Sequence, residues 1–454
     1  MKLNPNVRTS RMHGLVFIFN PPVGSWVAVT PQAYDYLERL VRNGHDPLAL
    51  GLSMGFSKEE IEEFLTLLFE RGILQEPQYL NTTIDFGLQS CYLHVTQACN
   101  LQCRTCYSWR ENRNDRKQEL SLEEMEGILS ELSRNGLKTL VISGGEPLMR
   151  RDLPEILRLA KQRYQIPKIV LITNGTLVTP KIAERLAPWV DEVSVSLDGP
   201  EEAINAYIRG RGNFDRAIRG VRFFQDASVK SVSLLSTLTH YNLPYVSDFR
   251  DLARQLGVGL SFSMFVGVGA GSSPESEDLY LTPEDLVTIG KFIMKGEVRL
   301  QLDTEGNDVL PFAQNDSEVM KINLDSRVGC GVGARIIAID YDGGVYPCHM
   351  LMRPELRMGT LLQDSLEDIL LNSTLGKFFR LLDVDSIDVC KKCSLRYFCG
   401  GGCRASAYSS SGSLTSHDPA CALYRTAIGL ALEPLLAKPR FNLNREAEAV
   451  DTTI

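Results

Sequence analysis

The sequence has no long apolar run, no excess of positive charge and no secretory signal. No window approaches the roughly 18 consecutive apolar residues of a membrane-spanning helix. Acidic residues outnumber basic ones, 56 to 48, and the net charge of -8 argues against a nucleic-acid partner, whose phosphates attract basic surfaces. The first residues lack the pattern of a signal peptide. We therefore expect a cytoplasmic protein with neither a membrane nor a nucleic-acid partner.

Cysteine is absent from the long middle of the chain. None of the eleven cysteines lies between Cys106 and Cys330. Disulfides are rare in the reducing cytosol, where grouped cysteines are better interpreted as metal ligands. The early group comprises Cys91, Cys99, Cys103 and Cys106, and the late group comprises Cys330, Cys348, Cys390, Cys393, Cys399, Cys403 and Cys421.

Three thiols lie within eight residues, at Cys99, Cys103 and Cys106. Thiolates are soft ligands, and three on one short loop can close around one metal centre. A closed structural zinc site requires a fourth ligand, which this loop lacks. The spacing therefore predicts a metal centre with an open position for chemistry. The alternative is a zinc site that takes a distant fourth ligand such as His94.

Apolar runs alternate with helical patterns from residue 92 onward. This alternation predicts an α/β fold with a parallel sheet and right-handed crossovers, either as a partial barrel or as an open sheet. The loops at the carboxyl ends of such strands form the active face, and the cysteine loop follows the first strand. The six expected strands are Tyr92–Val95, Thr139–Ile142, Ile169–Ile172, Val193–Leu197, Val232–Leu238 and Leu260–Phe265.

Polar side chains follow three of these strands. Ser143-Gly144-Gly145-Glu146-Pro147 ends the second strand, and its glycines let the backbone approach a ligand closely. Thr173 and Asn174 end the third strand, and Ser194, Ser196 and Asp198 end the fourth. Each tip alone is compatible with ordinary loop chemistry. Three polar tips beside three thiols on one face indicate a binding site.

The first 85 residues form a separate pattern. Leu15–Phe19 and Trp26–Val29 read as strands, and helices are expected from Thr30 and from the capping box that starts at Ser57. This pattern suits a winged-helix-like module. It lacks a Lys/Arg cluster, so a peptide partner, adding a strand to the sheet edge, is favoured over DNA. The alternative is a dimerisation or packing domain.

The motif Cys99-x3-Cys103-x2-Cys106-Tyr107 resembles the signature of the radical S-adenosylmethionine (radical SAM) superfamily. The positions of Gly144-Gly145-Glu146-Pro147 and Ser196-Leu197-Asp198-Gly199 strengthen this resemblance. It implies a partial (β/α)6 barrel over about residues 92–265. It also implies that the three cysteines hold a [4Fe–4S] cluster whose open iron binds SAM. One-electron reduction of that cluster would yield a 5′-deoxyadenosyl radical.

The same resemblance implies the contacts of SAM. Gly144, Gly145 and Glu146 would meet its methionyl amino group. Polar groups at the third and fourth strand tips, together with an arginine, would meet its ribose or carboxylate. For Arg209 the alternative is an ordinary surface arginine. These further cofactor contacts are expected from Thr173, Asn174, Ser194, Ser196, Asp198 and Arg209.

The late cysteines resemble the SPASM extension of radical SAM peptide maturases. By this resemblance Cys390, Cys393, Cys399 and Cys421 would ligate one auxiliary [4Fe–4S] cluster, and Cys330, Cys348 and Cys403 another. Some relatives supply a fourth cysteine shortly before Cys330, but position 324 is leucine here. The three-cysteine cluster would then keep an open iron or a non-cysteine ligand. A zinc ribbon of Cys390, Cys393, Cys399 and Cys403 is the alternative.

Two residues beside these motifs are interpreted separately. Cys91 starts the first strand and is expected to be a buried packing residue. His349 follows Cys348, where the anaerobic sulfatase-maturing branch of the superfamily has an aspartate base. Formylglycine formation is therefore disfavoured, but His349 remains the candidate catalytic base.

The sequence predicts one enzyme that is built from four parts. They are a peptide-recognition module (1–85), a radical SAM barrel (88–300), a cysteine-rich SPASM domain (310–425) and a C-terminal tail (426–454). The expected activity is oxidative crosslinking of a ribosomally made precursor peptide through a thioether or carbon–carbon bond. A flavodoxin- or ferredoxin-type protein would supply electrons. The alternatives are a maturase of a protein side chain or of a peptide-derived redox cofactor, and a non-catalytic zinc-binding adaptor.

Overall fold

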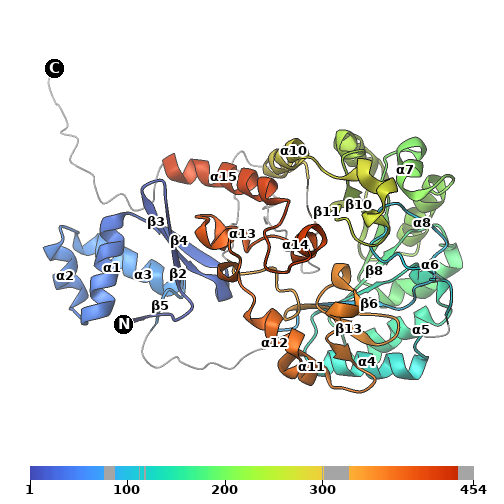
Figure 1. Ribbon diagram of the computed structural model, residues 1–454, viewed down its shortest axis with the longest axis horizontal. Helices are drawn as coiled ribbons and strands as arrows, with labels where there is room; N and C mark the ends of the chain where they lie inside the picture. Colours follow the sequence, from blue (N-terminus) through green and yellow to red (C-terminus); the bar gives the residue numbers. More distant parts are fainter. Residues whose placement is uncertain (76–86, 112, 117–118, 299, 301–326, 438–454) are drawn as a thin grey trace.

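A computed structural model describes residues 1–75, 87–111, 113–116, 119–298, 300 and 327–437 (Figure 1). These residues form sheets of nine, three and two strands. In Figure 1 the three-stranded sheet lies on the left and the nine-stranded sheet on the right, with the late cysteine-bearing segments between them. No helix among the described residues is long and apolar enough to cross a membrane.

All six strands expected from the sequence form, and they pair in parallel in chain order. An α/β architecture with a largely parallel sheet is thereby confirmed. Parallel pairing places the cysteine loop and the polar strand tips at one edge of the sheet. The strands are β6 (Ser90–His94), β7 (Thr139–Ser143), β8 (Lys168–Thr173), β9 (Glu192–Ser196), β10 (Val232–Leu238) and β11 (Gly259–Met264).

Helices connect these strands. The capping box at Ser121 is present, because its side chain accepts from the backbone of Glu124 while the Glu124 carboxylate accepts from the Ser121 backbone. Residues Leu153–Arg163 form an α-helix that ends in a π-helical turn. The helices are α4 (Leu122–Arg134), α5 (Leu153–Arg158), α6 (Pro180–Leu186), α7 (Glu202–Arg209), α8 (Phe214–Asp226) and α9 (Val246–Leu256).

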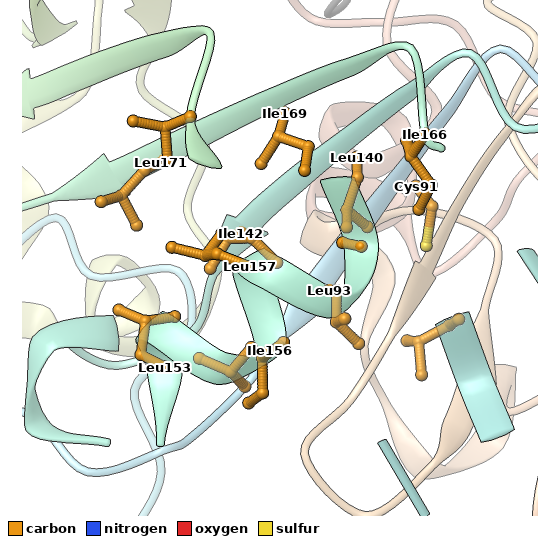
Figure 2. Packing of buried hydrophobic residues seen from close by; sticks show 14 of the residues in the cluster. Cys91, Leu93, Leu140, Ile142, Leu153, Ile156, Leu157, Ile166, Ile169 and Leu171 are labelled. Atoms are coloured by element: carbon orange, nitrogen blue, oxygen red, sulfur yellow. The ribbon is translucent and has the colours of Figure 1, made fainter. Parts of the chain in front are cut away.

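The main hydrophobic core lies between these helices and the sheet. Figure 2 shows Leu153 and Ile156 of α5 facing strand residues such as Leu140 and Ile142. Cys91 belongs to this core and is fully buried, so its interpretation as a packing residue is confirmed. The site therefore sits at the edge of a well-packed scaffold, which holds its loops in place.

The sheet continues into the predicted C-terminal domain. Strand β12 (Ile336–Ile339) pairs in parallel with β6, and β13 (Gly344–Tyr346) and β14 (Gly359–Thr360) follow antiparallel. The sequence did not indicate this pairing, because more than two hundred residues separate the two partner strands. The regions predicted as 88–300 and 310–425 thus share one mixed sheet.

Further helices connect the remaining described segments. They are α10 (Pro283–Met294), α11 (Leu366–Asn372), α12 (Thr374–Leu381), α13 (Arg396–Cys399), α14 (Arg404–Ser411) and α15 (Cys421–Ala437). Helices α10 and α15 pack closely, since a side chain at Gly290 would press on the Leu423 backbone. The boundary predicted at residue 426 falls inside α15, and 301–326 and 438–454 lie outside the described residues.

The described residues of the N-terminal region contain three more strands and one more helix than expected. Strands β2 (Arg8–Met12), β3 (Leu15–Asn20) and β4 (Ser25–Val29) form the three-stranded antiparallel sheet. The expected helix starts at Thr30 and Ser57 are confirmed. The other elements are β1 (Lys2–Leu3), paired with β5 (Leu74–Gln75), and helices α1 (Pro31–Asn43), α2 (Pro47–Ser53) and α3 (Lys58–Glu70).

Candidate metal and cofactor site

The cysteine loop leaves β6 and runs against the end of β7. The backbone amide of Gly145 donates to the Thr96 carbonyl at 2.8 Å, and that of Glu146 donates to the Ala98 carbonyl at 2.7 Å. A Cβ atom at Gly144 would overlap the Thr96 carbonyl, and one at Gly145 would overlap the carbonyls of Gln97 and Ala98. The two glycines therefore make room for the backbone that leads into Cys99.

The Glu146 carboxylate is buried and joins the ends of β7 and β8. It accepts from the Thr173 hydroxyl at 2.7 Å, from the Asn174 amide at 2.7 Å and from the Leu148 amide at 3.0 Å. Burial raises the pKa of Glu146 although these hydrogen bonds oppose the rise. The predicted contact residues Glu146, Thr173 and Asn174 are thus brought together, with Glu146 bonded to protein donors.

Asn174 also holds the cysteine loop. Its side-chain amide donates to the side-chain oxygen Oδ1 of Asn100 at 2.9 Å, and the side-chain amide of Asn100 in turn donates to the Thr176 hydroxyl at 2.9 Å. Asn100 lies directly after Cys99, so the end of β8 fixes the loop between its first two thiols. Sequence reasoning did not single out Asn100, although its position inside the motif was a signal.

The three early thiols lie close enough to influence one another. Burial raises the pKa of Cys103 to about 12, and the neighbouring Cys106 and Cys99 contribute to the rise. Burial likewise raises the pKa of Cys99, with Cys106 as a further cause. A bound metal ion favours the thiolate form and releases these protons. Three neighbouring, partly buried soft donors fit an iron–sulfur cluster.

The end of β9 carries a buried ion pair. Asp198 accepts from the Thr237 amide at 2.7 Å with one oxygen, and its other oxygen lies 2.7 Å from Nε of Arg209. Burial disfavours the charged guanidinium, but Asp198 and Cys103 outweigh it and raise the pKa of Arg209. The Arg209 side chain is only 13% exposed, so it is not an ordinary surface arginine.

The two predicted serines of β9 differ in their surroundings. Ser194 is fully buried, and its hydroxyl lies 3.0 Å from that of Ser233 on β10. Ser196 is partly exposed and lies nearer the carboxyl end of the strand. Of the two, Ser196 is therefore placed better for contact with a bound molecule.

The late cysteines gather in two sets. Burial raises the pKa of Cys403, and Cys330 and Cys348 add to the rise after Asp418. Burial raises the pKa of Cys399 to about 12, and the thiols of Cys421 and Cys390 contribute to this rise in pKa.

Cys393 belongs to the second set, because it is among the groups that raise the pKa of Cys390 and of Cys421 after burial. The structure thus places Cys403 with the first set and Cys421 with the second, unlike a zinc ribbon that includes Cys403. The ligand roles themselves stay predictions.

No three His, Cys, Asp or Glu side chains among the described residues come close enough together to hold one metal ion. A four-iron cluster attaches each thiolate to a different iron atom, so its ligands need no common central ion. Thiols spaced too widely for a single ion can therefore still serve such a cluster.

His349 lies between the two parts of the site. It begins a short 3₁₀ turn (His349–Leu351) and stacks on the Tyr92 ring with centroids 3.9 Å apart. The Tyr107 ring meets it edge-on at 5.1 Å. Burial, with a contribution from His94, lowers the pKa of His349 to about 3, so its imidazole is neutral at pH 7.

A buried polar chain connects the cysteine loop with β12. Nε2 of His94 lies 3.3 Å from the Tyr107 hydroxyl, and Nδ1 lies 3.7 Å from Asp340. Asp340 is fully buried, and its other oxygen lies 2.7 Å from Arg110. Both ring nitrogens of His94 therefore face protein groups, which argues against its use as a zinc ligand. No sequence signal pointed to Asp340.

Comparison with known proteins identifies the family. A model of the radical SAM superfamily matches residues 93–255, and a model of an iron–sulfur cluster-binding domain matches residues 330–394. The mycofactocin maturase MftC of Mycobacterium tuberculosis is 30% identical over 354 residues, which cover 77% of this chain and 87% of that protein. The chain belongs to the radical SAM superfamily. It also carries a SPASM domain, the extension expected from the late cysteines.

Other radical SAM relatives extend the comparison. The Fe-coproporphyrin III synthase of Methanosarcina barkeri is 27% identical over 368 residues, which cover 74% of this chain and 88% of that protein. The structure of anSMEcpe with bound AdoMet matches with a TM-score of 0.58 at 19% identity, covering 77% of this chain and 98% of that one.

One structural match includes the N-terminal module. Streptococcus suis SuiB, solved with its precursor peptide SuiA, has a TM-score of 0.57 and 17% identity, covering 92% of this chain and 99% of that one. A match that covers 92% of this chain must include part of the first 75 residues, because the remaining residues make up a smaller share of the chain. The shared fold therefore extends into the N-terminal module. At these identities the structures support the fold alone.

Proposed function

We propose that this radical SAM enzyme oxidatively crosslinks a ribosomally made precursor peptide, forming a thioether or a carbon–carbon bond. The observation that carries the proposal is the contact between Tyr107 and His349. These two residues directly follow Cys106 and Cys348. Their contact therefore brings one early cysteine and one late cysteine to neighbouring positions in the protein. A substrate there would face both centres.

Different residues would serve different parts of the reaction. In this proposal Cys99, Cys103 and Cys106 hold the first [4Fe–4S] cluster, and the two late thiol sets hold auxiliary clusters. The cluster held by these three cysteines would, with SAM bound, supply the one electron that forms a radical from SAM, and that radical would remove a hydrogen atom from an unactivated carbon. Arg150 is buried and ties the segments after β6 and before α4 together by donating to the carbonyls of Val95 and Leu120.

The interior beside these residues suits a substrate side chain. Tyr92, Val141, Val170 and Ala338 form a small buried apolar cluster on the four neighbouring strands β6, β7, β8 and β12. Since Tyr92 also stacks on His349, this apolar face adjoins the candidate base. We take the parallel strands as a partial barrel that encloses the reacting carbon.

The N-terminal module supplies the peptide specificity in this proposal. Its sheet has β2 and β4 as outer strands, and a leader peptide can extend such an edge through backbone hydrogen bonds. The match to SuiB, which was solved with a bound precursor peptide, supports this role. An electron-transfer protein of the flavodoxin or ferredoxin type would reduce the first cluster.

A second candidate function is maturation of a peptide-derived redox cofactor. The 30% identity to mycofactocin maturase MftC favours it. Both functions use the same thiol sets and the same module. They differ in whether the product remains a peptide with a new internal bond or goes on to a small molecule.

Co-expression with a short cysteine-containing reading frame beside the gene tests the proposal. We expect the peptide to lose about two mass units for each new bond, because two hydrogen atoms leave. The Cys106→Ala variant is the control and should leave the peptide mass unchanged. A peptide that is unmodified by the native enzyme under reducing, SAM-supplied conditions would contradict the proposal, and a released small product would favour the second candidate.

A further inference from the structure

The N-terminal sheet has two buried faces. In β3, Val16 and Ile18 pack toward helices α1 and α3, whereas Phe17 and Phe19 pack in the opposite direction. Alternate residues of a strand point to opposite faces, so the second face needs its own partner. In Figure 1 that partner is the segment around α13, which lies beside β3 and β4.

Aromatic rings interlock at this contact. The Phe398 ring of α13 is 1% exposed and meets Phe19 at 4.9 Å and Trp26 at 5.1 Å, both edge-on. Phe17 meets it from 5.9 Å in the same manner. Such pairs contribute beyond the burial of their surface. The module and the segment around α13 are therefore joined by a specific interface.

The interface lies directly beside the thiols of the second late set. Phe398 immediately precedes Cys399, and the Ser10 hydroxyl of β2 donates to the carbonyl of Ser394, which follows Cys393, at 2.9 Å. Cys390 and Cys399 themselves pack against the hydrophobic cluster that contains Phe17 and Phe19.

We propose that the N-terminal sheet is a wall of the site formed by Cys390, Cys393, Cys399 and Cys421. This inference rests on the proposed function, in which these thiols hold an auxiliary iron–sulfur cluster. The rings of Phe17, Phe19 and Trp26 enclose that cluster on one side and hold the loop between its ligands. The module thus has a second role besides capturing peptide.

Two physical effects favour a role of the N-terminal sheet as a wall of this site. The stability and potential of an iron–sulfur cluster depend on its solvent exposure and on the residues that orient its ligands. A loop held by packed rings also keeps the spacing of two ligands fixed before the cluster assembles. Because coupling is reciprocal, a cluster that depends on the sheet must also stabilise the sheet.

The first test compares two substitutions on opposite faces of β4 in the full-length, anaerobically loaded enzyme. Trp26→Ala removes a wall ring, whereas Val27→Ala changes the face toward the helices. We expect Trp26→Ala to lose one cluster's iron to a chelator roughly tenfold faster than the native chain, because it opens an aromatic-sized gap in the wall. Val27→Ala should lose iron at the native rate.

The second test measures the reciprocal effect by hydrogen exchange. Cys421→Ala removes a ligand on α15 and leaves the residues of the N-terminal sheet unchanged. We expect faster amide exchange across β3 in this variant than in the loaded native enzyme. Exchange in α1 and α3 of Trp26→Ala should stay slow, which shows that the module remains folded.

The outcomes separate this inference from the proposed function. Equal iron loss from Trp26→Ala and Val27→Ala, or unchanged exchange in β3 of Cys421→Ala, would contradict the proposal that the N-terminal sheet is a wall of this site. If Cys421→Ala holds as much iron as the native enzyme, no cluster uses this cysteine, and the proposed ligand set is wrong instead.

Discussion

Gly144 and Gly145 show how tightly single residues constrain the cysteine loop. The sequence predicted that these glycines let a ligand approach. The structure shows that they first let the loop's own backbone pass, since any side chain there would meet the carbonyls of Thr96, Gln97 or Ala98. The motif could be read from the sequence, but the partner of each glycine could not, because backbone contacts between distant segments leave no local pattern.

The Gly145→Ala substitution should destabilise the protein by about 2 kcal/mol, because the new methyl group overlaps two backbone carbonyls that cannot move freely. Urea unfolding of the apoprotein measures this change, and equilibrium dialysis of SAM should show weaker binding to the loaded variant.

Gly127→Ala is the matched control. Gly127 lies in α4, and a methyl group there would meet nothing within 4 Å beyond its chain neighbours and its own helix backbone, so alanine should stabilise by about 0.5 kcal/mol. Equal stability of the two variants would contradict the packing described.

Residue type alone identified Asp198 and Arg209 as candidates but could not predict their contact. Both were expected to contact the cofactor, and the structure brings them within 2.7 Å of each other. A buried carboxylate attracts a cation wherever one can reach it, so the pair satisfies its own charges. The sequence indicated that both residues are functional candidates but not that they pair with each other.

Whole elements were predicted well where the pattern was local. The capping box at Ser57 and the apolar runs of the parallel strands are properties of a few neighbouring residues, and the structure contains them. Strand β2 was missed because its sequence Arg8-Thr-Ser-Arg-Met12 is mostly polar and becomes a strand through pairing with β3. The pairing of β12 with β6 was missed for the same reason, since tertiary contacts decide it.

Strand β12 brings Asp340 to the cysteine loop, and this contact can be tested. Asp340→Asn should lower the free energy of unfolding by about 2 kcal/mol, because it leaves Arg110 and His94 without their anionic partner. Urea unfolding of the apoprotein at neutral pH measures the loss. Asp251→Asn breaks an exposed pair with Arg254 and should change stability by less than about 0.5 kcal/mol.

The Asp340 contribution should also depend on pH. Burial alone would raise the pKa of Asp340, but His94 and Arg110 outweigh it and hold that pKa below its ordinary value. A carboxylate with a lowered folded-state pKa stabilises the fold above its unfolded-state pKa, and this contribution is lost as the pH falls through the lowered value. The difference between native and Asp340→Asn apoprotein should therefore shrink on acidification, and a difference that grows would contradict the ion pairing.

At the scale of the whole molecule, the late cysteine segments lie between the N-terminal sheet and the parallel sheet (Figure 1). Composition and cysteine placement predicted the parts, but not how they pack. No sequence signal indicated that Phe398 would bury itself among the rings of the N-terminal sheet, because nothing local distinguishes an interface aromatic residue from a core one.

Leader binding makes a prediction at this scale. A synthetic leader segment of the precursor should slow hydrogen exchange in the outer strand that it joins, β2 or β4, because added backbone hydrogen bonds protect edge amides. A scrambled leader of the same composition is the control. Protection confined to the region of β6 to β11 would contradict leader capture by the N-terminal module.

We propose that ten cysteines hold three iron–sulfur clusters, in the sets Cys99/Cys103/Cys106, Cys330/Cys348/Cys403 and Cys390/Cys393/Cys399/Cys421. The direct measurement is iron and zinc content per chain after anaerobic reconstitution, for the native enzyme and for three variants with Cys103, Cys348 or Cys399 changed to alanine. We predict about twelve iron atoms in the native enzyme and about four fewer in each variant. Zinc in place of iron, or iron content that none of these substitutions lowers, would contradict the claim.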